Sequence, residues 1–266
     1  MTFHTDVADA GPVSVARLGR KSAPHAIHAA THTSRPASCS SVVPNSEETL
    51  TSTPSSTSSQ AAKANRQVEK ARYSANITAG PLMLPESRRI AALLLTAPNK
   101  EAWQHAIRFE NLLQKSTPAT ALRLARLIRD RLDTMPPAAW QIVASGSHEA
   151  ATQTLLVAAL RHSPLLADFF RQVVAAHYRK LDTELTSREW EPFLADCAAR
   201  EPEVAAWTTT TRAKVFQVIV RILAGARYLE STRTLRLRAV SLHPDVLGLL
   251  KTTGDQNLID ILELRG

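Results

Sequence analysis

From Pro85 onward, apolar residues recur mostly every three or four positions, which is the period of helices that bury one face. The stretch "STPATALRLARLIRDRL" (116–132) is a clear example, because Thr117 can cap a helix that has Pro118 at its first position. On a helical wheel its apolar stripe consists of Ala121, Leu124, Ala125, Ile128 and Leu132. The pattern therefore predicts a helix that packs one face and exposes its arginines.

The same period predicts helices along most of the remaining chain. Pro85 opens "ESRRIAALLL", and Asn99 caps "KEAWQHAIRFENLL", with Trp103, Ile107 and Leu113 facing inward. Further helices are expected at about 137–145, 147–161, 164–180, 187–200 and 209–226, followed by two short C-terminal ones. Within residues 227–242, Leu235 and Leu237 instead alternate with Arg236 and Arg238, which indicates a short β-hairpin. We therefore expect an all-α fold with one hairpin.

Residues 1–70 differ in composition from the rest of the chain. Serine and threonine fill 20 of these positions and five more are proline, so this segment cannot bury enough apolar surface to offset the entropy of ordering it. We expect a disordered extension, or a start assigned too far upstream with the working protein beginning near Ala71. The remaining chain is divided by prediction into an N-terminal helix-turn-helix unit (71–135) and a helical C-terminal part with a second such unit (136–266).

The helix at 116–132 has a second copy. "TPATALRLARLIRDRL" (117–132) aligns without a gap on "TTTTRAKVFQVIVRIL" (208–223), at an offset of 91 positions. Each copy follows another predicted helix, and "QKST" before the first copy has the length of a helix-turn-helix turn. A recognition helix places its N-terminal side chains in the major groove of DNA. Amphipathic helices also resemble one another by pattern alone, so the charges have to distinguish the two interpretations.

Positive and negative residues are segregated near the second copy. Residues 208–240 contain seven Lys or Arg and one acid, whereas 182–203 contain seven acids and two arginines. A generic solvated surface mixes both signs. The basic block combines the second copy with the expected hairpin, which would act as the wing of a winged helix and contact the phosphate backbone. The candidate DNA-binding residues are Thr120, Arg123, Arg126, Thr211, Lys214, Gln217, Arg221, Arg236 and Arg238.

These residues differ in the contacts available to them. Arg126 can pair with Asp130 and Arg129 with Asp133, whereas Arg123 has no acid three or four residues after it. Gln217 suits a bidentate contact with adenine, while the arginines suit guanine or phosphate.

Composition narrows the class of function further. The net charge of +8 and pI near 9.9 favour an anionic partner such as nucleic acid. Two distant cysteines, Cys39 and Cys197, suit a reducing cytosol, and no apolar run approaches the ~20 residues that span a bilayer. Neither a glycine-rich phosphate loop nor a grouping of histidines typical of metal or catalytic sites is found. We expect a soluble, cytoplasmic, non-enzymatic protein that needs no cofactor or metal.

Three segments resemble a known family. "YSANITAGPLMLPESRRIAALLL" (73–95), "ENLLQKSTPATALRLARLIRDRL" (110–132) and "EPEVAAWTTTTRAKVFQVIVRIL" (201–223) are similar to the BrxA family of bacteriophage exclusion (BREX) systems. The first segment is the most specific. The resemblance implies an all-helical, monomeric protein with two helix-turn-helix units that binds double-stranded DNA. It also implies a setting beside a methyltransferase, an ATPase and other defence components.

Two other functions stay open on the sequence. A helical adaptor could use its basic faces to dock an acidic protein partner of the defence complex. A basic helical bundle could also bind RNA. Competition between duplex DNA, single strands and RNA would separate these alternatives from binding to double-stranded DNA.

Overall fold

The computed structural model describes residues 72–263, and the expectations for residues 1–70 lie outside this range. The described elements are η1 (Ala75–Ala79), α2 (Leu84–Leu95), α3 (Lys100–Arg108), α4 (Pro118–Leu132), α5 (Pro137–Ser145), α6 (His148–His162), α7 (Pro164–Phe169), η2 (Phe170–Val174), α8 (Ala175–Lys180), η3 (Ser187–Glu189), α9 (Trp190–Arg200), α10 (Pro202–Ala205), α11 (Thr209–Gly225), α12 (Pro244–Thr252) and α13 (Gln256–Leu262). The all-α prediction is confirmed.

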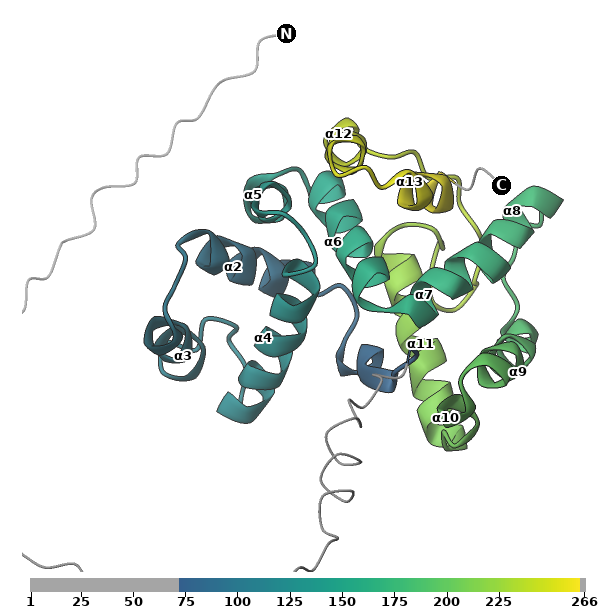
Figure 1. Cartoon of the computed structure of the whole chain (residues 1–266), viewed down its shortest axis with the longest axis horizontal. Coiled ribbons are helices and arrows are strands. Elements are labelled where there is room, and N and C mark those ends of the chain that lie inside the picture. Colours follow the sequence, from purple (N-terminus) through teal and green to yellow (C-terminus); the bar gives the residue numbers. More distant parts are fainter. Residues whose placement is uncertain (1–71, 264–266) are drawn as a thin grey trace, which may run out of the picture. The chain divides into compact units, whose positions relative to one another are not determined.

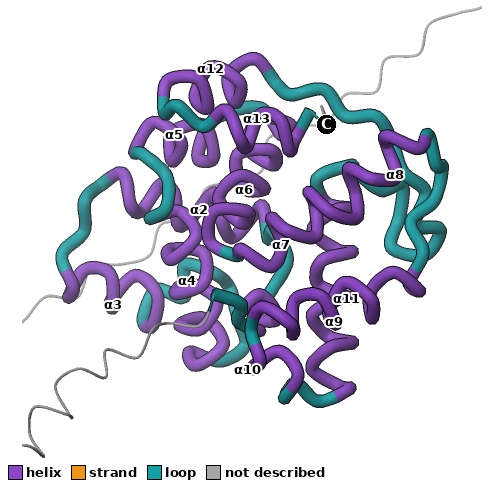
Figure 2. The backbone as a smooth tube through the Cα atoms, turned by 45° about the vertical axis from the view of Figure 1, so that its right-hand side comes forward, coloured by secondary structure: helices purple, strands orange, loops and turns teal. Residues whose placement is uncertain are grey.

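Helix α6 lies at the centre of the packing. It contacts α2, α4, α5, α7 and α12, and every residue from Ala150 to Leu160 is buried. A helix that is buried on all sides has no polar face, which explains why this stretch reads "AATQTLLVAAL". Figures 1 and 2 both show α3 and α4 on one side of α6, with α8 and α9 on the other. The two copies of the repeated helix, α4 and α11, therefore pack in different surroundings.

Side-chain caps mark where several helices begin, and those at Asn99 and Thr117 were predicted. The side chains of Asn99, Thr117 and Thr208 accept hydrogen bonds from backbone N–H groups in the first turns of α3, α4 and α11. Thr186 and Glu189 form the two reciprocal hydrogen bonds of a capping box ahead of α9. These local signals lie next to one another in the chain, so the sequence alone reveals them.

Helix α3 ends earlier than its pattern predicts. It stops at Arg108, five residues before Leu113, which is nevertheless buried as expected. Asn111 and Gln114 take up left-handed backbone conformations (φ 49° and 52°), which cannot continue an α-helix. The connection to α4 therefore runs from 109 to 117, and the prediction of a short "QKST" turn is wrong.

The expected hairpin wing at 227–242 does not form as strands. Instead, isolated antiparallel bridges join Leu229 to Leu237 and Glu184 to Arg236. Leu235 has a φ of 50°, which interrupts extended backbone, and the segment also bonds to the loop at 183–185. The alternation of leucine and arginine does correspond to alternating burial, because Leu235 and Leu237 pack on the core while the intervening arginine is exposed.

The contacts between residues group all described residues into one unit, which spans 60–266. The boundary predicted between residues 135 and 136 therefore stays a prediction. Helices α2 and α5, which lie on opposite sides of that boundary, pack against each other. Between residues 72 and 263, no helix has both the length and the apolar character needed to cross a membrane.

Candidate nucleic-acid interface

Helices α4 and α11 begin in the same way, 91 positions apart. The Thr117 hydroxyl accepts a hydrogen bond from the Thr120 backbone N–H (3.2 Å) and donates to the Thr120 hydroxyl (2.9 Å). Thr208 makes the equivalent pair with Thr211, at 3.1 Å to the backbone N–H and 2.9 Å between the hydroxyls. The offset read from the sequence therefore aligns the first turns of both helices.

The buried faces of the two helices also correspond. Five buried positions of α4 align at the same offset with buried positions of α11, and the pairs are Leu124 with Val215, Leu127 with Val218, Ile128 with Ile219, Arg131 with Ile222 and Leu132 with Leu223. Ile128 is 1% exposed and Ile219 is 0% exposed. Since the inner faces match, the outer faces are aligned as well.

The predicted site residues on α4 are accessible. Arg123 and Arg126 are exposed, while Thr120 is half-buried and bonded to its cap. Of the two ion pairs that the spacing allows, the structure forms Arg129–Asp133 at 3.4 Å. Within residues 72–263, neither Arg123 nor Arg126 forms an ion pair.

The predicted site residues on α11 and after it are divided between different surroundings. Lys214, Gln217 and Arg221 are exposed and Thr211 is half-buried. Gln217 and Arg221 line a hollow of about 230 Å³.

The two arginines from the expected wing lie elsewhere. Arg238 lines a different hollow, beside His148 of α6, and Arg236 forms an exposed ion pair with Glu184 at 3.4 Å. The structure therefore does not gather the wing arginines onto the exposed face of α11.

A groove between α3 and α4 concentrates positive charge. Its volume is about 930 Å³, and its lining consists of Pro98, Lys100, Trp103, Gln104, Arg108, Leu122, Arg123, Arg126, Arg129 and Asp130. We call this the basic groove. Five of these residues are cationic and only Asp130 is acidic, so the field in the groove attracts anions. Arg123 and Arg126 also border a second hollow, beside η1.

The sequence interpretation missed the contribution of α3 to this groove. Lys100, Gln104 and Arg108 are spaced four residues apart, which places them on one face of a helix. All three line the groove opposite α4. A helical wheel drawn for α3, and not only for the helix after it, would have revealed the cationic face.

The two helices before the second copy, α9 and α10, have the opposite charge. Glu191 of α9 occupies the position 91 residues after Lys100, and it forms an ion pair with Arg212 of α11 at 3.2 Å. Glu203 adds a further exposed acid in α10. The acidic flank of α11 therefore neutralises part of its own positive charge.

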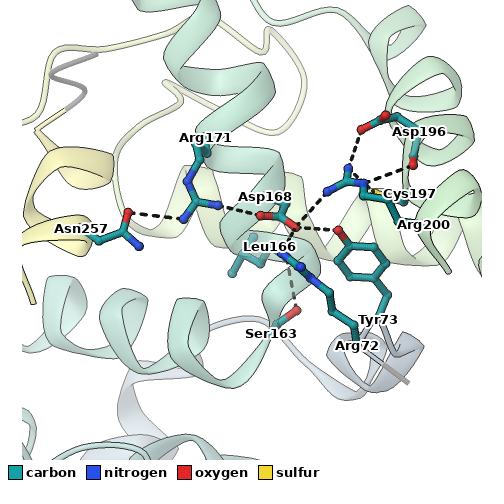
Figure 3. A network of polar contacts seen from close by, with 10 residues as sticks. All are labelled: Arg72, Tyr73, Ser163, Leu166, Asp168, Arg171, Asp196, Cys197, Arg200 and Asn257. Atoms are coloured by element: carbon teal, nitrogen blue, oxygen red, sulfur yellow. Dashed lines mark hydrogen bonds and ion pairs between the residues drawn. The ribbon is translucent and has the colours of Figure 1, made fainter. Parts of the chain in front are cut away.

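A buried carboxylate anchors the segment that begins the described chain (Figure 3). Asp168 accepts hydrogen bonds from the Tyr73 hydroxyl (2.6 Å), Arg171 (2.7 Å) and Arg72 (3.1 Å), and Arg200 lies 3.6 Å away. Burial, and then the hydrogen bond to Asp168, raise the pKa of Tyr73. A buried charge needs such partners, so this cluster fixes η1 against α7 and α9.

Cys197 lies beside this cluster and is fully buried. Burial raises the pKa of its thiol to about 11, so the thiolate that a nucleophile requires is scarce at neutral pH. The position suits a small apolar residue, as its place in a helix predicts.

Arg131 is a second residue whose role the pattern did not reveal. It is 3% exposed on the inner face of α4, and its guanidinium donates to the carbonyls of Pro81 (2.6 Å) and Gly80 (2.8 Å). Burial lowers its pKa to about 10, which still leaves it charged at neutral pH. It ties the chain between η1 and α2 to α4, and η1 contacts both α4 and α11.

The described chain is thus an all-helical protein in which a repeated, capped helix carries exposed cations and borders a basic groove. The BrxA family model matches residues 71–254, and the chain belongs to this family.

Curated relatives and a solved structure agree with this assignment. The BREX protein BrxA of Paramagnetospirillum magneticum is 38% identical, over 73% of this chain and 97% of that protein. The BREX protein BrxA of Escherichia coli O9:H4 is 39% identical, over 71% of this chain and 88% of that protein. A crystal structure of an uncharacterized protein from Magnetospirillum magneticum is 37% identical and has a TM-score of 0.67, covering 73% of this chain and 99% of that chain.

Proposed function

We propose that this chain is a non-enzymatic, double-stranded DNA-binding component of a BREX phage-defence system. Membership of the BrxA family and the similarity to proteins named BREX protein BrxA support its place in such a system. One observation carries the DNA-binding part of the proposal: α4 and α11 share caps and five buried positions, and both expose a cation at one equivalent position, Arg123 and Lys214.

The first turns of these two helices present the side chains that would meet DNA. A recognition helix uses residues near its N-terminus to contact DNA, and the first exposed cations of the two helices are Arg123 and Lys214. Within the described range neither forms an ion pair, so both charges are available to phosphate. Gln217, one turn further on α11, can form two hydrogen bonds with adenine. In this proposal α3–α4 and α9–α11 act as two helix-turn-helix units, with connections longer than the usual turn.

Several polar groups that could suggest catalysis have structural partners instead. Both ring nitrogens of His177 face carboxylates, at 2.9 Å from Asp182 and 2.7 Å from Glu189. The Cys197 thiol is buried and its pKa is raised. These contacts give both groups a structural role. We further propose that the protein acts as a monomer in the cytoplasm, alongside a methyltransferase, an ATPase and other BREX components.

Titration of the full-length protein with labelled duplex DNA at several salt concentrations tests the proposal. If Arg123 and Lys214 each neutralise one phosphate, changing both to Ala should flatten the slope of log affinity against log salt by about 1.8, at about 0.9 per contact. Unlabelled duplex should compete better than single-stranded DNA or RNA of the same length.

A matched control comes from Lys180→Ala combined with Lys251→Ala. These lysines are exposed and lie on α8 and α12, away from α3 in Figures 1 and 2. Equal slopes for the parent, the Arg123/Lys214 variant and this control would contradict a role for α4 and α11 in DNA binding. Stronger competition by RNA would instead support an RNA-binding protein.

A further inference from the structure

The basic groove has a cationic wall on each of its two helices. Lys100 and Arg108 belong to α3, whereas Arg123 and Arg126 belong to α4. Within residues 72–263 none of these four side chains forms an ion pair or a hydrogen bond. These four unpaired positive charges, with Asp130 as the one acid in the lining, repel one another, and a bound polyanion would relieve that repulsion.

The floor of the groove is held in place. Trp103 is 7% exposed, and the guanidinium of Arg129 lies 4.8 Å from the centre of its ring. Arg129 also forms the ion pair with Asp133, so its position is set by two partners. A groove whose shape does not depend on flexible side chains alone is better organised for a ligand before binding.

The chemistry of the lining favours phosphodiesters over an acidic protein. Charged residues are depleted at the centre of protein–protein interfaces, which are built around apolar anchors. In the described chain the large exposed apolar side chains are Leu95, Phe109 and Leu181, and none of them lines the groove. Spaced cations with one carboxamide, Gln104, instead match a row of phosphates.

Resting on the proposed function, we propose that the basic groove holds the phosphate backbone of one DNA strand, with Lys100 and Arg108 of α3 as additional contacts. Contacts to phosphate carry no base information, so this groove supplies affinity without sequence preference. Base discrimination then depends on the rest of the interface, where Gln217 is the suitable side chain. Helix α3 is thus part of the binding surface in addition to supporting α4.

The test is a Lys100→Ala/Arg108→Ala variant of the full chain, titrated with duplexes of several unrelated sequences. The salt slope should flatten by about 1.8, and affinity should fall by the same factor for every duplex. Both residues are exposed and unpaired within the described range, so the melting temperature should match that of the parent. The Lys180/Lys251 variant controls for the loss of net charge.

Different failures have different meanings. If Lys100/Arg108 behaves like the control while Arg123/Lys214 flattens the slope, α3 does not contact DNA and this inference falls, although the proposed function stands. A loss confined to one duplex sequence would overturn the assignment to backbone binding. If the parent binds no duplex, both proposals fall together. If the variant keeps its DNA affinity but loses retention on immobilised poly-glutamate, the groove binds an acidic protein instead.

Discussion

Helices α4 and α11 are two copies of one repeated helix, and the charges around them differ. Both begin with a threonine cap bonded to a second threonine, and they share five buried positions. Helix α3, just before α4, contributes Lys100 to the basic groove, whereas α9, which is followed by the short α10 and then α11, places Glu191 against Arg212. The buried face of each repeated helix therefore specifies how the helix packs. The charges on the neighbouring helix decide how many of the repeated helix's exposed cations remain free to bind an anion.

The two copies also differ within the repeat. Asp130 lies in the basic groove at the position that corresponds to Arg221 of α11. The buried Arg131 of α4 corresponds to the apolar Ile222. The first copy thus has an acid on its exposed face and a cation on its buried face, and both exceptions depend on what surrounds α4.

The largest effect is expected from the shared buried face. Ile128→Asp or Ile219→Asp would bury a carboxylate without a partner, which costs several kcal/mol out of a typical total of about 5–15 kcal/mol. Each variant should therefore lose helicity by circular dichroism. Arg126→Asp and Gln217→Asp, on the exposed faces of the same helices, should stay folded. If both isoleucine variants keep the parent's helicity, the two faces have been assigned wrongly.

A smaller effect is expected from exchanging the charges at equivalent outer positions. Asp130→Arg adds a cation to the basic groove and should steepen the salt slope of DNA binding by about 0.9, while Arg221→Asp should flatten it by about 0.9. Salt titration by fluorescence anisotropy measures both changes. Asp130→Asn removes the acid without adding a contact, so it should strengthen binding less than Asp130→Arg. A weaker affinity for Asp130→Arg would show that the groove does not face DNA.

The smallest effect should be the same in both copies. Thr117→Ala and Thr208→Ala each remove a helix cap, which typically costs about 1 kcal/mol. For a chain of this size such a loss lowers the melting temperature by about 2–4 °C. Thr117→Ser and Thr208→Ser keep the hydroxyl and should melt close to the parent. A clear difference between the two alanine variants would mean that the caps are not energetically equivalent.

Most helices could be predicted because their signals are local. A cap at Thr117, a proline at the next position and a stripe of buried residues all lie within one helix. The early end of α3 was not predicted, because Leu113 is apolar and buried whether or not its backbone is helical. The hairpin expected at 227–242 failed for a related reason. Leu235 and Leu237 can be buried alternately with an exposed arginine wherever one side of the segment faces the core and the other faces solvent. Such burial does not require hydrogen-bonded β-strands.

The sequence by itself determined the helical period and the caps of α3 and α4, because each is encoded in neighbouring residues. It also determined the offset that relates α4 to α11, because the two stretches align without a gap. Only the tertiary structure decided which charges remain available. Arg236 pairs with Glu184, and Asp168 accepts hydrogen bonds from Arg72 and Tyr73, across long separations in the chain. Electrostatic interaction depends on distance in space, and a helical wheel gives that distance only within one helix. The basic groove therefore became visible only when α3 was placed against α4.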